Sequence, residues 1–263
     1  MKKKKLLSYK KYRTLRHSTP YIFHLQKNGQ YIFYFGAKHT FDPKDPQYKK
    51  INKYWEDFLR VINKNGCLAL IEGGSRKVYK TKTQAIRDGG EMSYVTYLGN
   101  KSGIKTFSPE PPTQYRYREL LKKFSKKEIA YYDFALVCYQ WNRYKKKPNF
   151  EKYVNRFLES DKRHSGWKNF DFSLKNMFRI HKKIFGVKFN KNDKLFFRDI
   201  LDPIGNKSVI NKISLFEESI RDEYIVQKIE ELWKKGKNLF VIYGASHTVR
   251  QEGVIRDFVS RSY

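Results

Sequence analysis

Two stretches near opposite ends of the sequence share one pattern, a five-residue apolar run followed directly by Gly-Ala-x-His-Thr. The first run is YIFYF at 31–35, followed by GAKHT; the second is LFVIY at 239–243, followed by GASHT. Apolar runs of this length, rich in branched and aromatic residues, are typical of buried β-strands. A strand that stops at glycine brings the next side chains to the carboxyl edge of a sheet, where open α/β folds place their sites. The repeat therefore predicts that His39 and His247 are displayed, not buried, at one shared site. The alternative is two unrelated strand ends, each with a capping or core histidine.

Glu72 follows a further predicted strand. Apolar residues recur at helical spacing from Tyr48 to Ile62, and the run CLALI at 67–71 is again typical of a buried strand. A strand, a helix and a strand in this order form a βαβ unit, whose two strands run parallel. We therefore expect His39 and Glu72 to emerge close together at the same edge. The alternative for Glu72 is a helix N-cap or a solvated turn residue.

Glu91 is the second acidic candidate. It follows Gly89-Gly90, which interrupt a helical pattern between 81 and 98, and it lies in the first turn of the helix that begins there. The helix dipole favours a carboxylate at this position, so capping alone would explain it. A third predicted strand at 104–107 places a second α/β step beside the first.

The middle of the chain has a different character. Ser125 and Glu128 have the spacing of a capping box before a helical pattern at 129–141, and further helical patterns continue to about 187. A helix from about 215 to 235, with Arg221 near its start, then leads into the last strand. We predict one α/β domain over 1–263, with a mostly parallel or mixed central sheet flanked by helices. It has a basic lead-in at 1–20 and a helical insertion at about 113–210.

The formal net charge of +30 raises the question of a nucleic-acid or anionic-membrane partner. Lys greatly outnumbers Arg, and Asn, Ile, Tyr and Phe are also abundant, as AT-rich coding would produce. Because arginine is the preferred bidentate reader of phosphates and bases, this bias favours composition over function as the source of the charge. Nucleic-acid binding, including base stacking on the aromatic residues of the middle region, is kept as the less favoured alternative.

Cys67 and Cys138 are the only cysteines, and neither has zinc-site spacing. They are typical of core thiols in a reduced compartment. The lysines at 2–5 are not followed by the apolar segment of a secretory signal, and no apolar run approaches the ~18 residues that span a bilayer. We expect a soluble, cytoplasmic protein.

The combination of these features resembles the TraB/GumN, Tiki, ChaN and erythromycin-esterase superfamily over about 31–110 and 215–258. Gly36 with His39 matches the first G-x-x-H motif of that superfamily, and Gly244 with His247 matches the second. Glu72 stands at the acid that ends its second strand. Glu91 and Arg221 stand at its second glutamate and at its arginine ahead of the last strand. The sequence departs from the family pattern at Gly73-Gly74 and at 248–250, where TVR replaces the frequent Leu-x-Gly.

The resemblance implies a hydrolase of the peptidase or esterase type, which cleaves an amide or ester in a small-molecule or peptide substrate. It implies catalytic roles for His39, Glu72, Glu91, Arg221 and His247. Of these, His39, Glu72 and His247 would be ligands of a divalent Mn, Co, Zn or Fe ion.

The same resemblance places Gly36 and Gly244 beside the bound cofactor. Two imidazoles and a carboxylate also suit such a metal on chemical grounds, with open positions for water and substrate. Without metal, one histidine would act as general base, oriented by a glutamate, with Arg221 stabilising the oxyanion. The alternatives are a ChaN-like protein that binds haem or iron, and a basic nucleic-acid-binding protein with structural histidines.

Overall fold

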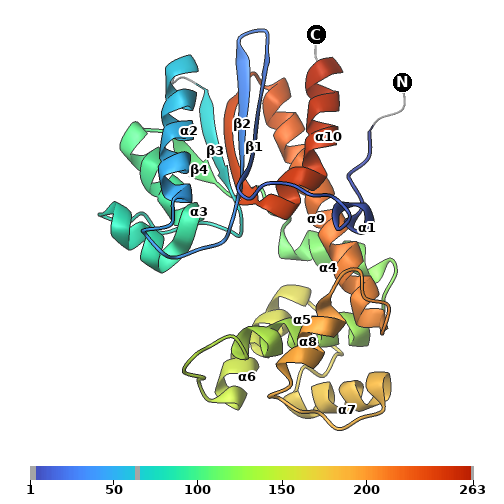
Figure 1. Ribbon diagram of the computed structural model, residues 1–263. Coiled ribbons are helices and arrows are strands. Elements are labelled where there is room, and N and C mark those ends of the chain that lie inside the picture. Colours follow the sequence, from blue (N-terminus) through green and yellow to red (C-terminus); the bar gives the residue numbers. More distant parts are fainter. Residues whose placement is uncertain (1–3, 63–65, 262–263) are drawn as a thin grey trace. The chain divides into compact units, whose positions relative to one another are not determined.

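The computed structural model describes residues 4–62 and 66–261. The chain divides into two compact units, Met1–Glu110 with Asp222–Tyr263, and Pro111–Arg221. The second unit covers the stretch for which the sequence predicts a helical insertion in one domain. All strands of the described residues belong to the first unit, and the second is helical (Figure 1).

The first unit is built on a five-stranded sheet with the order β1-β2-β5-β3-β4. The strands β2 (Gln30–Ala37), β5 (Asn238–Gly244), β3 (Cys67–Ile71) and β4 (Lys105–Phe107) run parallel, and β1 (Tyr21–Lys27) pairs antiparallel with β2. The predicted fold class, an α/β protein with a mostly parallel or mixed sheet flanked by helices, is therefore confirmed.

The sequence analysis missed β1. It has no continuous apolar run, because polar His24 and Gln26 occupy alternate positions of this edge strand. The signal that could have found it is the Asn28-Gly29 pair that joins β1 to β2. Both residues have positive φ, 52° and 75°, as a tight hairpin turn between antiparallel strands requires.

The two strands of the predicted βαβ unit, β2 and β3, run parallel as expected but are not adjacent in the sheet. The last strand, β5, is inserted between β2 and β3, so that Ile32 and Leu68 both lie beside Leu239. A βαβ unit does not require its two strands to be adjacent, and the apolar pattern alone does not reveal the insertion. Because all three strands are parallel, their carboxyl ends still meet at one edge of the sheet.

Helices cover both faces of the sheet (Figure 1). Alternate side chains of β5 point to opposite faces. Phe240 and Ile242 join the core formed with α2 (Gln47–Val61) and α3 (Lys82–Ser102). Leu239, Val241 and Tyr243 join the core formed with the later part of α9 (Val209–Lys234) and with α10 (Ala245–Arg261). Since β5 is buried on both faces, it reads as a continuous apolar run.

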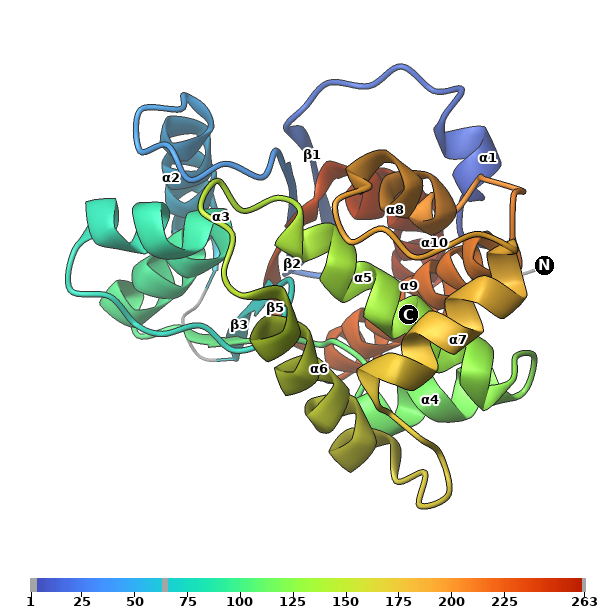
Figure 2. The same ribbon diagram turned by 90° about the horizontal axis from the view of Figure 1, so that it is seen from below.

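The second unit has its own aromatic-rich core. Its helices are α4 (Thr113–Leu121), α5 (Lys126–Trp141), α6 (Phe150–Ser165), α7 (Leu174–Phe185), α8 (Lys194–Leu201) and the first part of α9. Helix α5 packs against α6, α7 and α8 (Figure 2). The predicted capping box at its start is confirmed, with Ser125 and Glu128 each bonded to the other's backbone.

The basic lead-in predicted at 1–20 contains one short helix. Residues 1–3 lie outside the described part of the chain, whereas α1 (Tyr9–Tyr12) packs against α10. Along the described ranges, no helix combines the length and the apolar character needed to cross a membrane.

Candidate functional site

The carboxyl edge of the sheet brings together side chains from three parallel strands. His39 lies two residues after β2, Glu72 directly after β3, and His247 in the first turn of α10, which begins where β5 ends. The insertion of β5 places its terminus between the other two. The backbone topology thus delivers the three residues that the repeated motif and the βαβ unit predicted.

Glu72 lies between the two histidines. Its Oε2 is 3.8 Å from Nε2 of His39, and its Oε1 is 3.5 Å from Nε2 of His247. The backbone amide of Gly244, at the end of β5, donates a hydrogen bond of 2.7 Å to Oε2. The carboxylate of Glu72 is thus fixed by the central strand, with one imidazole on each oxygen.

Glu91 orients His39 from the other side. Its Oε1 lies 2.5 Å from Nδ1 of His39, and Glu91 is 3% exposed whereas the His39 side chain is 59% exposed. Because an ionised carboxylate only accepts hydrogen bonds, this contact assigns the proton to Nδ1 and leaves the lone pair of Nε2 toward Glu72. The hydrogen bond that Nδ1 of His39 donates to Glu91 also raises the pKa of His39 above its ordinary value.

The position of Glu91 depends on a break in α3. Gly90 has φ 65° and ψ −154°, so the helical pattern is interrupted there as predicted, and a new turn begins at Glu91. A Cβ at Gly90 would lie 3.4 Å from the backbone oxygen of Thr40, which shows how closely this bend approaches the loop after β2. The bend therefore brings the Glu91 carboxylate to His39.

His247 has a carboxylate partner that the sequence analysis did not identify. Oδ1 of Asp222, on α9, lies 2.7 Å from Nδ1 of His247 and also accepts a hydrogen bond from Gln251. Asp222 is fully buried. Helical periodicity did not single out Asp222, because it cannot show which polar residue of a long helix faces a site. Nδ1 of each histidine therefore contacts a buried carboxylate of its own, and Nε2 of both histidines lies near the shared carboxylate of Glu72.

The prediction that His247 is displayed was wrong, since the residue is only 6% exposed. The chain enters α10 at Ala245 without an intervening loop. The first turn of that helix therefore carries His247 inward against Asp222, whereas His39 lies on a loop and stays open to solvent.

Arg221 belongs to the second unit. Burial opposes ionisation of Glu217, one turn earlier in α9, but Arg116 and, to a smaller extent, the charge of Arg221 lower the pKa of this carboxyl. The contacts that define the histidine cluster are all made by residues of the first unit. The predicted role of Arg221 in stabilising an oxyanion therefore stays a prediction.

The two motif glycines have different surroundings. A Cβ on Gly36 would lie 2.7 Å from Oγ1 of Thr248 and 2.8 Å from the backbone oxygen of Tyr21, so glycine lets β2 approach α10. A Cβ on Gly244 would lie 2.8 Å from Nε2 of His39. Gly36 thus has a packing role, and Gly244 lines the histidine cluster.

His39, Glu72 and His247 are the predicted metal ligands. Among the residues at 4–62 and 66–261, no group of three or more His, Cys, Asp or Glu side chains is arranged to hold a metal ion. The donor types of His39, Glu72 and His247 suit a transition metal, and the predicted ligand set stays a prediction.

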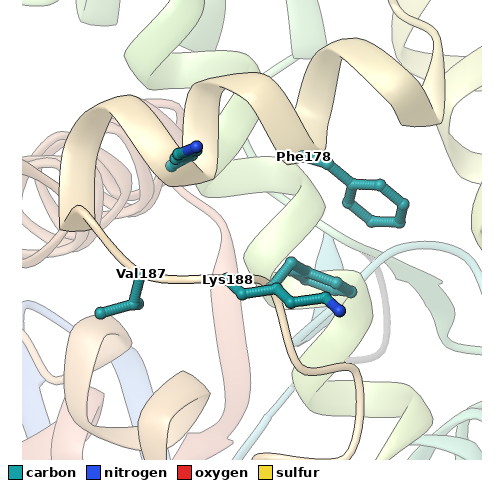
Figure 3. Close-up of a pocket in the computed structure, with 5 residues that line it drawn as sticks. Phe178, Val187 and Lys188 are labelled. Carbon is teal, nitrogen blue, oxygen red and sulfur yellow. The ribbon is translucent and has the colours of Figure 1, made fainter.

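A separate pocket of about 590 Å³ lies in the second unit (Figure 3). It is lined by α7 and the segment that follows it, with the side chains Phe178, Lys182, Val187, Lys188 and Phe189. Figure 3 shows the Phe178 ring and the extended Lys188 side chain at this pocket. The five described residues that line it are aromatic, aliphatic or basic.

No family model, curated protein sequence or solved structure matches this chain.

Proposed function

We propose that the first unit is a hydrolase that activates water with His39 as general base and cleaves an ester or amide. One observation carries this proposal: Nδ1 of His39 is held at 2.5 Å by buried Glu91, while the ring stays open to solvent. An imidazole that donates one N–H to a carboxylate and keeps a lone pair on its second nitrogen is the usual form of a general base.

The reaction follows from these positions. Nε2 of His39 accepts a proton from water as the water oxygen attacks the carbonyl carbon of the substrate. When the tetrahedral intermediate collapses, the bond to the leaving alcohol or amine breaks, and the proton moves from Nε2 to that group. Glu91 fixes the imidazole ring and stabilises its charged form during the cycle, as the third member of a catalytic triad does.

Glu72 contributes a second negative charge. Its carboxylate lies 3.8 Å from Nε2 of His39 and favours the protonated imidazole that forms when water is activated. The Gly244 amide holds it in place. His247, fixed by Asp222, presents Nε2 to the other oxygen and completes the enclosure of Glu72.

A divalent metal is a further part of the hypothesis, from the family resemblance. In metal-bound histidines, the ring nitrogen that does not bind the metal commonly donates its N–H to a carboxylate. Nδ1 of His39 and Nδ1 of His247 have such carboxylate partners. No step above depends on a metal. Elemental analysis of protein purified without a polyhistidine tag, together with chelator treatment, tests the ion and the haem or iron alternative.

The test of the proposal is hydrolysis of p-nitrophenyl acetate and of p-nitroanilide peptides by the full chain. General-base catalysis typically contributes about 10²–10⁴-fold, so His39→Ala should lower kcat/KM by at least about 100-fold on whichever probe is cleaved. His24→Ala is the matched control, because His24 is exposed on the edge strand β1. A His39→Ala rate equal to that of wild type contradicts the proposal.

A further inference from the structure

Arg250 is buried in α10 although it carries a permanent charge. It is 2% exposed, and its Nη1 lies 2.5 Å from Oδ2 of Asp222. Its Nε donates a hydrogen bond of 3.1 Å to the backbone oxygen of Leu7, and its guanidinium lies 3.9 Å from the centre of the Tyr9 ring. One side chain thus joins the N-terminal segment to the carboxylate that orients His247.

The N-terminal segment Lys4–Tyr12 is attached to α10 at several points. Leu7 exchanges two hydrogen bonds with Arg250, since the amide of Leu7 also donates to the Arg250 carbonyl at 3.0 Å. The amide of Lys4 donates to the Asp257 side chain at 3.2 Å, and Ser8 caps α1. Figure 1 shows α1 beside α10. The segment therefore closes over Arg250.

The physical requirement of this arrangement is strict. A guanidinium that leaves water needs a charged partner and acceptors in the right directions, and breaking a buried pair is far more costly than losing an exposed one. Asp222 supplies the charge, Leu7 the acceptor and Tyr9 the flat aromatic face. Without the segment, the part of the Arg250 guanidinium that contacts Leu7 and Tyr9 would be exposed to water. The side chain could then adopt conformations in which it no longer contacts Asp222.

Asp222 transmits the constraint to the site. Its Oδ2 forms an ion pair with Arg250, and its Oδ1 lies 2.7 Å from Nδ1 of His247. The ion pair at Oδ2 restricts the rotation of the carboxylate and thereby the position of Oδ1. We propose that Arg250 is a positioning residue that fixes Asp222 and thereby His247, and that Lys4–Tyr12 is the strap that holds Arg250 in place. The catalytic consequence rests on the proposed hydrolase function; the geometric consequence does not.

The experiment separates these two consequences. Tyr9→Ala removes the aromatic face from Arg250 without touching Asp222 or His247, and Tyr9→Phe keeps that face. Lys10→Ala, at an exposed position of the same short helix, is the matched control. The Nδ1 proton resonances of His247 and His39 are recorded by ¹H–¹⁵N NMR on the ¹⁵N-labelled full chain, and p-nitrophenyl acetate hydrolysis is measured beside them.

We expect Tyr9→Ala to shift or broaden the His247 resonance and to leave that of His39 unchanged. On kcat we expect a loss of about tenfold with KM unaltered, the low end of the loss seen when an outer-sphere orienting group is removed. Tyr9→Phe and Lys10→Ala should match wild type. Arg250→Lys, which keeps the charge and loses the planar fork, should resemble Tyr9→Ala.

An unchanged His247 resonance in Tyr9→Ala overturns the strap, whatever Arg250→Lys does to the fold. An altered resonance in Tyr9→Phe as well as Tyr9→Ala overturns it too, since the aromatic face is then not what matters. If wild-type protein cleaves no probe, the hydrolase proposal fails alone, and the His247 resonance still decides the positioning role.

Discussion

At the scale of single residues, the site is a set of matched histidine and carboxylate pairs. Glu91 backs His39, Asp222 backs His247, and Glu72 lies between the two rings. The two pairs differ in exposure, because His39 is open to solvent whereas His247 is buried. In the proposed mechanism, this difference favours His39 for water activation and gives His247 a supporting role.

The two motif glycines give a residue-scale prediction. A methyl group on Gly36 would meet the backbone of Tyr21 and the buried side chain of Thr248, neither of which has room to move. Gly36→Ala should therefore lower the free energy of unfolding by about 1–3 kcal/mol, the usual cost of overpacking. Urea denaturation followed by circular dichroism measures it.

Gly244→Ala is the matched control. Its methyl group would meet the far end of the exposed His39 ring, which can swing away. We expect a smaller loss of stability than in Gly36→Ala and a lower rate of ester hydrolysis, because Nε2 of His39 is displaced from Glu72. Equal stability losses in both variants would show that Gly244 is also a packing residue.

The pH profile gives a second prediction at this scale. A general base must be unprotonated, and the hydrogen bond that His39 donates to Glu91 raises the pKa of His39. Ester hydrolysis should thus fall with decreasing pH through an apparent pKa above the ordinary value of ~6.5. Glu91→Gln should move this inflection to lower pH and also lower the plateau rate.

The raised pKa of His39 also makes the free energy of unfolding depend on pH. A raised histidine pKa stabilises the fold fully below the unfolded pKa, and this stabilisation is lost as pH rises through the folded pKa. Since His39 is largely exposed, the effect should be small. An unchanged pH–rate inflection in Glu91→Gln would contradict the role given to Glu91.

How much of the site the sequence reveals depends on where each residue lies. His39 and Glu72 directly follow buried apolar runs, so strand recognition and parallel topology were enough to place them at one edge. Asp222 has no such marker, because its function depends on which way a 26-residue helix faces. The burial of His247 could not be predicted either, since it depends on α10 starting without a loop.

At the scale of secondary-structure elements, the insertion of β5 between β2 and β3 organises the first unit. The sequence reveals the strands with continuous apolar runs, whereas β1 alternates in polarity and escapes that criterion. Strand order is set by long-range pairing, which local patterns do not encode. The strand order does not change the edge at which the site residues lie, because the carboxyl ends of parallel strands are on the same side of the sheet in any order.

Helix α6 in the second unit supports a prediction about pH. Burial, followed by the charge of Asp133, raises the pKa of Asp161 to about 7. Between about pH 4 and 7 the folded state then binds more protons than the unfolded state, so stability falls as pH rises over this interval. Asp161→Asn should remove this loss and stabilise the protein at pH 8 by on the order of 1–2 kcal/mol.

Urea unfolding at pH 5 and pH 8 measures this effect. Glu159→Gln is the control, because Glu159 is an exposed carboxylate on the same helix. The same pH dependence in Asp161→Asn as in wild type would assign it to other groups.

At the scale of the whole molecule, the +30 charge belongs to both units. We interpret it as a result of lysine-rich composition and expect only weak, sequence-independent binding of nucleic acid at physiological salt, with a steep salt dependence. Fluorescence anisotropy with single-stranded and duplex oligonucleotides at two salt concentrations checks this. Tight and sequence-specific binding would favour the nucleic-acid alternative.

The central claim is that the histidine cluster acts as one catalytic unit. A double-mutant cycle with His39→Ala and His247→Asn tests it most directly. Asn is chosen at the buried position because its amide can still donate to Asp222. Residues of one catalytic unit have strongly non-additive effects, because a unit that has lost one member has little left to lose.

The measurement is kcat/KM for p-nitrophenyl acetate in wild type, both single variants and the double variant, with thermal unfolding as the check on the fold. We predict that the folded double variant is no slower than the slower single variant. Losses that multiply, or activity that survives in both single variants, would contradict the claim that His39 and His247 serve one reaction.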